Sequence, residues 1–235
     1  MDRLDLSHLV VVKTIGNRFF LAPVDTETTH RILDVGTGTG ICEISVRTCT
    51  WVPPNVKFEV DDVECAWIVN KKYDFIFSRA PNGWAEFEDM SVIYGCDDGT
   101  VTEDLALMKW ARLFAEACQK LGREDSPGPK LEDWVRQAPF KNVVHQHFKI
   151  PLGPWPKDAH NKDVRMCNLA QTLEGLDAFT LKLFIGVLGW TREEVVVLFA
   201  QVRKDLKNSA IHAYLNYHVV YGQKIEVEEE RAAED

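Results

Sequence analysis

Three features that would mark whole classes of protein are missing from this sequence. No apolar run approaches the roughly 20 residues that a membrane-spanning helix needs. The six cysteines contain no C-x-x-C pair, which argues against a zinc ribbon and against a disulfide framework. Lysine and arginine form no cluster of the kind that neutralises phosphates. We therefore expect reduced cysteines, no binding to membranes or nucleic acid, and a cytoplasmic or nuclear location.

The composition that remains is typical of a globular chain. Of the 235 residues, 46% are hydrophobic and 27% are charged, which suits one domain with a real core. The net charge is −9, and the last ten residues contribute six acids against one arginine. We predict a single domain over residues 1–225 and an acidic, disordered tail over residues 226–235.

The first half of the chain contains short apolar runs that end in turns, a pattern that indicates strands. A Gly-Asn turn at residues 16–17 separates two apolar stretches and predicts a hairpin or a capping arm. A glycine loop follows the first predicted strand and leads into the start of a helix at 41–46. The predicted strands cover residues 31–35, 56–60, 73–77 and 84–94.

In the second half, the hydrophobic period changes from 2 to 3.6 and indicates helices. Thr102 is expected to cap an amphipathic helix that ends before Gly122, and Thr191 and Glu194 form a capping box for a later helix. Further helices are predicted at 131–137, 163–176 and 180–188, and strands at 140–150 and 211–221, the last of them half-buried. Together these elements predict an α/β fold with a helical lid, about 160–208, inserted before the last strand.

The glycine loop is the most informative stretch in the chain. Its pattern is Asp34-x-Gly36-x-Gly38-x-Gly40, placed between a predicted strand and a predicted helix. Glycines let the backbone turn tightly and approach a ligand, and the helix N-terminus offers free N–H groups. A carboxylate two positions before the first glycine would repel a pyrophosphate but would attract a cationic sulfonium and ammonium. The spacing therefore favours S-adenosyl-L-methionine over NAD.

The segment Ile32–Gly40 (ILDVGTGTG) resembles motif I of the class I S-adenosylmethionine-dependent methyltransferases. The segments Trp51–Phe58 (WVPPNVKF) and Gly153–Asp158 (GPWPKD) are similar to the fungal LaeA-like branch of that superfamily, which is linked to secondary metabolism. The resemblance covers nearly the whole chain apart from the acidic tail. It implies a Rossmann-like methyltransferase sheet.

The resemblance also implies roles for individual residues. Asp34 would hold the methionine end of the cofactor, and Asp62 with the backbone of Val63 would bind the adenine. Ser78 and Arg79 follow the fourth strand of such a sheet, where the transfer site is lined. The implied cofactor-binding set is Asp34, Gly36, Thr37, Gly38, Gly40, Asp62, Val63, Ser78 and Arg79.

Two connections are shorter than the resemblance requires. Residues 41–50 are too few for a helix, a turn and a strand that would carry the acid for the ribose hydroxyls. Residues 80–84 cannot form a parallel crossover, which needs ten or more residues. A sheet reduced in this way would leave apolar surface uncovered. The alternative to an enzyme is therefore a catalytically degenerate relative, a pseudoenzyme that serves as an interaction or regulatory protein.

Histidines and aromatic residues are the remaining candidates. His145 and His147 share one face of a predicted strand, as do His212 and His218 on another, but no third metal ligand is spaced with them, so no metal site is predicted. We expect exposed or hydrogen-bonded histidines there. The candidates for a general base are His212, Tyr214 and His218. The aromatic residues Trp110, Trp155, Phe179, Phe184 and Trp190 either pack in the core or line a substrate pocket.

The function predicted from the sequence is methyl transfer from S-adenosyl-L-methionine, linked to fungal secondary metabolism. The acceptor, a small molecule or a protein, is not specified by any motif. A regulatory protein partner is compatible with the resemblance.

Overall fold

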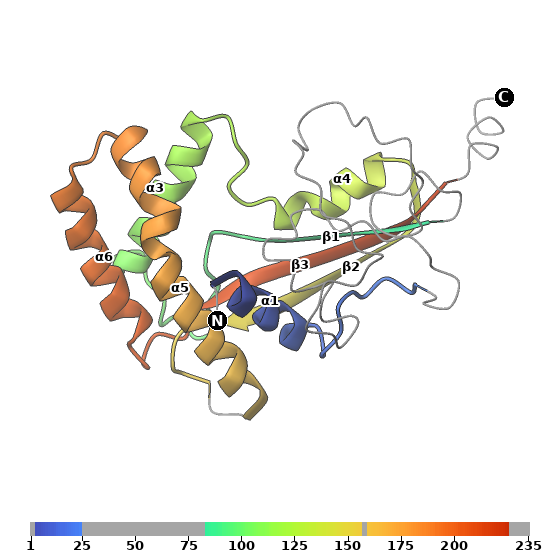
Figure 1. Ribbon diagram of the computed structural model, residues 1–235, viewed down its shortest axis with the longest axis horizontal. Helices are drawn as coiled ribbons and strands as arrows, with labels where there is room; N and C mark the ends of the chain where they lie inside the picture. Colours follow the sequence, from blue (N-terminus) through green and yellow to red (C-terminus); the bar gives the residue numbers. More distant parts are fainter. Residues whose placement is uncertain (1–2, 25–82, 157–158, 226–235) are drawn as a thin grey trace, which may run out of the picture.

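The computed structural model describes residues 3–24, 83–156 and 159–225 (Figure 1). Its elements follow one another as α1 (Arg3–Thr14), β1 (Trp84–Met90), α3 (Ala106–Lys120), the 3-10 turn η1 (Gly128–Lys130), α4 (Leu131–Gln137), β2 (Phe140–Pro151), α5 (Ala159–Gly186), α6 (Arg192–Leu206) and β3 (Tyr214–Lys224). The strands predicted in the second half of the chain and at 84–94 are confirmed as β2, β3 and β1, and the helix at 131–137 as α4. The strands predicted at 31–35, 56–60 and 73–77 lie outside the described residues.

The described strands form one sheet in the order β1-β3-β2. Because β1 and β2 both run antiparallel to β3, they run parallel to each other, and their carboxyl ends lie at the same edge of the sheet. The pairing ends there with Met90 opposite Tyr217 and Pro151 opposite Tyr214. Mixed sheets, in which an antiparallel strand pairs with parallel ones, are common in folds that combine helices and strands.

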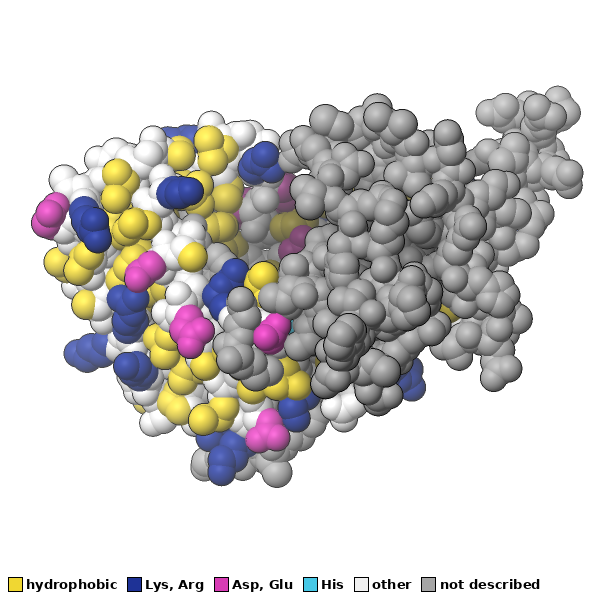
Figure 2. Space-filling model, in the orientation of Figure 1, with side chains coloured by type: hydrophobic (Ala, Val, Ile, Leu, Met, Phe, Trp, Pro, Cys, Tyr) yellow, Lys and Arg dark blue, Asp and Glu magenta, His cyan; other side chains and the backbone are white. Residues whose placement is uncertain are grey.

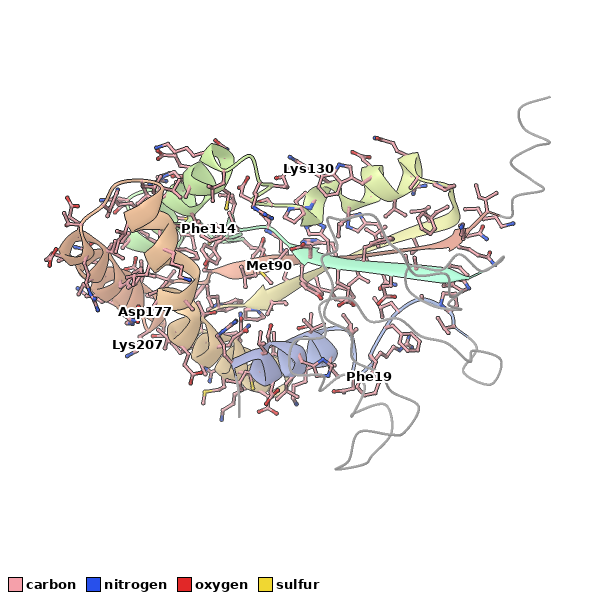
Figure 3. All side chains as sticks on the ribbon, turned by 45° about the horizontal axis from the view of Figure 1, so that its top comes forward. Phe19, Met90, Phe114, Lys130, Asp177 and Lys207 are labelled. Carbon is pink, nitrogen blue, oxygen red and sulfur yellow. The ribbon has the colours of Figure 1, made fainter. Side chains whose placement is uncertain are left out.

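Helices cover both faces of the central strand β3 (Figure 3). On one face Val219 packs with Val10 of α1 and Val164 of α5, and on the other Val220 packs with Val135 of α4. Val219 and Val220 are neighbours in the sequence, and both are fully buried. The prediction of a half-buried last strand is therefore wrong, because the alternating pattern did not show that a second layer covers the polar face.

Helices α3, α5 and α6 form a bundle beside the carboxyl edge of β1 and β2 (Figure 1). Figure 2 shows hydrophobic side chains among charged ones over the surface of this bundle. The two helices predicted at 163–176 and 180–188 are in fact one helix, α5. Thr180, at the predicted break, is buried and accepts a 2.8 Å hydrogen bond from the indole of Trp110, so its polar group is satisfied inside the helix.

The predictions for the N-terminal segment and for the start of α3 also need correction. The N-terminal segment forms helix α1 and not a hairpin, because Val10 packs against α5 and the sheet, and the turn at Gly16 and Asn17 follows the helix. Helix α3 begins at Ala106 rather than directly after Thr102. Its Leu107 N–H donates a 3.0 Å hydrogen bond to Asp205 of α6, so a neighbouring helix caps this terminus.

The described part of the chain contains no helix long and apolar enough to cross a membrane. Its cysteines Cys96, Cys118 and Cys167 are free thiols, as predicted. Gly122 follows α3 with φ of +66°, which confirms the predicted end of that helix.

A buried carboxylate ties the N-terminal segment to the sheet. Glu86 of β1 accepts backbone hydrogen bonds from Leu21 at 2.8 Å and from Ala22 at 2.6 Å. Burial, followed by the charge of Glu88, raises the pKa of Glu86 to about 8. The ionised form is therefore disfavoured in the folded protein.

We expect Glu86→Gln to become more stable relative to the unchanged protein as the pH rises from 5 to 8. The folded pKa lies above the unfolded one, so the stability that Glu86 contributes at low pH is lost as the pH rises towards 8. The amide cannot ionise, and its oxygen still accepts from Leu21 and Ala22. Urea unfolding should show that the free energy of unfolding of Glu86→Gln, relative to that of the unchanged protein, is about 2 kcal/mol higher at pH 8 than at pH 5. A constant difference across this range would contradict the assignment.

The predicted capping box at the start of α6 is present. Glu194 N–H donates to Thr191 Oγ1 at 3.2 Å, and Thr191 N–H donates to Glu194 Oε2 at 2.8 Å. Thr191→Ala should lower the free energy of unfolding by about 1 kcal/mol, whereas Thr191→Ser should change it by much less. Urea titration of the two variants measures the difference, and equal stability of both would show that this cap contributes nothing.

Candidate functional site

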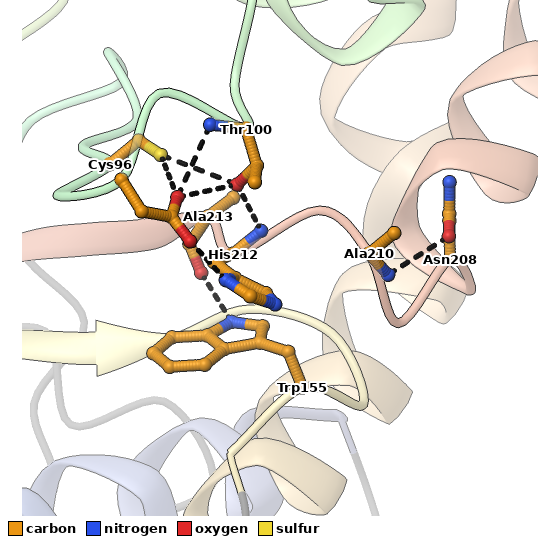
Figure 4. Close-up of polar contacts among 8 residues, drawn as sticks. Cys96, Thr100, Trp155, Asn208, Ala210, His212 and Ala213 are labelled. Carbon is orange, nitrogen blue, oxygen red and sulfur yellow. Dashed lines mark hydrogen bonds and ion pairs between the residues drawn. The ribbon is translucent and has the colours of Figure 1, made fainter.

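Three separate segments meet at the carboxyl edge of the sheet (Figure 4). The turn 96–100 comes after β1, Trp155 comes after β2, and His212 lies two residues before β3. In open α/β sheets, ligands bind outside the carboxyl ends of the parallel strands. This edge is therefore the candidate site.

Backbone hydrogen bonds hold the three segments in place. Gly95 and Tyr214 exchange two of them, at 2.8 and 3.0 Å, and the ring of Tyr214 leaves no space for a side chain at Gly95. The carbonyl of Ala213 accepts from the Leu152 N–H and from the Trp155 indole, both at 2.9 Å. The edge is thus built from main-chain contacts, which fix its side chains on a rigid support.

Asp98 is the most heavily bonded carboxylate at this edge. Its Oδ1 accepts from the Thr100 hydroxyl at 2.8 Å, the Thr100 N–H at 3.2 Å and the Cys96 thiol at 3.0 Å. Its Oδ2 pairs with Nδ1 of His212. These donors, Cys96 first, hold the pKa of Asp98 well below its usual range. Gly99, with φ of +76°, closes the turn that brings them together.

His212 is held by this carboxylate at one side of its ring. Its backbone N–H donates to Thr100 Oγ1 at 2.9 Å, and its imidazole lies against the indole of Trp155 with ring centroids 5.2 Å apart. Because a carboxylate accepts from Nδ1, the neutral ring carries its proton there and presents a lone pair at Nε2. Nε2 has no hydrogen-bond partner among the described residues, and 38% of the side chain is exposed.

Tyr214 is fixed by different partners. Its hydroxyl donates to Asp97 Oδ1 at 2.8 Å, and Lys149 binds both oxygens of Asp97 at 2.7 Å. The hydrogen bond to Asp97 raises the pKa of Tyr214, and the bond from Lys149 lowers the pKa of Asp97. A phenol kept protonated in this way is poorly suited to remove a proton.

His218 lies away from this edge, on the sheet face that α4 covers. His218 Nδ1 is 2.9 Å from His145 Nε2, and His145 Nδ1 is 2.8 Å from a carboxylate oxygen of Glu132 on α4. His147 stacks on His218 and bonds Asn216 at 2.8 Å. Of the predicted alternatives, exposed or hydrogen-bonded histidines, the structure shows the hydrogen-bonded one. The described residues contain no group of three side chains arranged to hold a metal.

The three predicted base candidates therefore have different surroundings in the structure. The structure also adds residues to the candidate site that the sequence did not indicate. The sequence pattern does not single out Asp98 or Thr100. A glycine flanked by Asp98 and Thr100 is a turn signal, but nothing in it indicates a pairing with a histidine more than 100 residues later. Of the predicted aromatic residues, Trp110 and Phe184 are buried in the bundle, whereas Trp155 is at this edge.

The predicted cofactor-binding residues lie outside the described part of the chain. They are Asp34, Gly36, Thr37, Gly38, Gly40, Asp62, Val63, Ser78 and Arg79. The short connections at 41–50 and 80–82 lie there as well.

The pKa of His218 makes the stability of the sheet depend on pH. Burial, followed by the charges of His147 and His145, lowers this pKa to about 4. The folded pKa is below the unfolded one, so the stability contributed by neutral His218 is present above about pH 6.5 and is lost as the pH falls towards 4.

We therefore expect the stability difference between the unchanged protein and His218→Gln to shrink by about 1–2 kcal/mol from pH 7 to pH 4, allowing for solvent screening. Urea unfolding at several pH values measures it. A difference that stays constant or grows at low pH would contradict the assignment.

Several curated proteins are similar to this chain over most of its length. It is 35% identical to the methyltransferase pytC of Aspergillus terreus, in an alignment that covers 95% of this chain and 80% of the relative. It is 29% identical to the secondary metabolism regulator LAE1 of Cochliobolus heterostrophus, over 93% of the chain and 85% of the relative. The corresponding values for the secondary metabolism regulator laeA of Aspergillus fumigatus are 28%, 95% and 70%. No protein-family model matches the chain.

This similarity defines the class of protein: the chain is a methyltransferase. It belongs to the LaeA-like family of fungal methyltransferases, which confirms the resemblance seen in the sequence. The alignment with pytC extends over 260 residues, more than the 235 of this chain, so the relative has residues that this chain lacks. That agrees with the unusually short connections noted above.

Proposed function

We propose that the protein transfers a methyl group from S-adenosyl-L-methionine to an acceptor of fungal secondary metabolism. The observation that carries the proposal is the similarity to the methyltransferase pytC over 95% of the chain. The relatives named as secondary metabolism regulators support the link to that metabolism. The acceptor is a small molecule or a protein, the protein acts in the cytoplasm or the nucleus, and a regulatory protein is its expected partner.

The proposed fold is a reduced Rossmann-like class I sheet in a single domain over residues 1–225, followed by the acidic tail. The parallel relation of β1 and β2 supports it, because strands of such a sheet present their carboxyl ends at one edge.

The chemistry of the glycine loop suits the proposed cofactor. The Asp34 carboxylate would attract the cationic methionine end, while Gly36, Gly38 and Gly40 let the backbone approach it. Asp62 would accept a hydrogen bond from the adenine amine. The cofactor, when bound, supplies a methyl group activated by the positive charge on sulfur.

Calorimetric titration of S-adenosylmethionine into the purified full chain tests this proposal. We expect micromolar binding, weakened by about 10- to 100-fold in Asp34→Ala because a charge-assisted contact is lost. Asp133→Ala removes an exposed carboxylate on α4 and should bind as the unchanged protein does. A folded protein that shows no binding would contradict the enzyme and leave a non-catalytic regulatory protein as the explanation.

A further inference from the structure

We propose that His212, held by Asp98, accepts the proton of a hydroxyl group on the methyl acceptor. This inference rests on the proposed function and extends it to the acceptor side of the reaction. It assigns a base and a chemical class of acceptor to a site for which the sequence left three candidates open.

The position of His212 is the first support. It lies where the segments after β1, after β2 and before β3 meet, at the edge where the parallel strands end. The neighbouring Ala213 is anchored through its carbonyl to both Leu152 and Trp155. A side chain on such a support loses little entropy when it is positioned for reaction.

The bonding of Asp98 is the second support. Its Oδ1 is fully used by Cys96 and Thr100, which leaves Oδ2 for the imidazole of His212. The carboxylate orients the ring and stabilises the imidazolium that forms when Nε2 gains a proton. The other charged groups at this edge, Asp97 and Lys149, are paired with each other.

The other titratable groups at the site are less suited to the role. The Tyr214 hydroxyl already donates to Asp97. His218 is 8% exposed and its Nδ1 is within hydrogen-bond distance of His145. By contrast, Nε2 of His212 is directed away from Asp98, on a ring that is more than one-third exposed (Figure 4).

A dedicated base indicates a hydroxyl acceptor rather than an amine or a thiolate. A neutral amine attacks through a free lone pair, and a thiolate carries its own charge, whereas a hydroxyl is a weak nucleophile until its proton leaves. In the proposed step the acceptor O–H bond breaks and the proton moves to Nε2 of His212. The oxygen forms a bond to the methyl carbon, the carbon–sulfur bond of S-adenosylmethionine breaks, and the sulfonium becomes a neutral thioether.

Two methyl acceptors, of which only one needs a base to remove its proton, test the proposal on the full chain. Phenol needs its proton removed during transfer, whereas thiophenol reacts as a thiolate at neutral pH. With methyl-labelled S-adenosylmethionine, we expect the unchanged protein to methylate both. His212→Asn, whose amide can still reach Asp98, should lose about 10²- to 10⁴-fold in rate with phenol and little with thiophenol. Asp98→Asn should act in the same direction, because its amide would reverse the ring tautomer.

The controls separate this inference from the proposed function. His147→Gln, on the sheet face away from this edge, should leave both rates unchanged. His212→Asn should bind S-adenosylmethionine as tightly as the unchanged protein by calorimetry. If neither the unchanged protein nor any variant binds S-adenosylmethionine, the proposed function itself is contradicted.

Three outcomes would overturn the inference while leaving cofactor binding intact. One is that His212→Asn methylates phenol as fast as the unchanged protein. Another is that the substitution lowers the rates of phenol and thiophenol methylation equally, which would indicate a structural role for His212. The third is that the unchanged protein binds S-adenosylmethionine but methylates thiophenol alone.

Discussion

The central strand β3 is the constraint on which the rest of the described structure depends. It pairs along both edges, with β1 and β2, and helices cover both of its faces. Fully buried neighbours such as Val219 and Val220 are possible only in a strand enclosed in this way. Because β3 is antiparallel to both partners, it forces β1 and β2 to end at the same edge, and the candidate site lies there.

Enclosure of the sheet also determines its electrostatics. Glu86 and His218 lie on opposite faces of the sheet, Glu86 under the segment that follows α1 and His218 under α4, and burial shifts both towards their neutral forms. Asp98, at the open edge, has the reverse environment: several donors surround it and keep it ionised. An ionised carboxylate next to an exposed imidazole is therefore found at the edge of the sheet, whereas the titratable groups buried on its faces are shifted towards their neutral forms.

Local signals in the sequence were enough for several elements. The capping box at Thr191, the glycine after α3 and the short helix α4 were predicted correctly, because each depends on residues within a few positions of one another. The errors at α1, α3 and α5 share a different cause. Asp205 caps α3 from another helix, and Thr180 is satisfied by Trp110, so distant partners decided where these helices begin and end.

The sequence by itself determined the family of this protein, since the motif Ile32–Gly40 and the branch segments are runs of adjacent residues. It also supplied His212 as one of three possible bases. Only the tertiary structure distinguishes the surroundings of the three, because the pairing of His212 with Asp98 joins positions more than 100 residues apart. Such a contact depends on how the strands pair in space, and the spacing of residues along the chain does not predict that pairing.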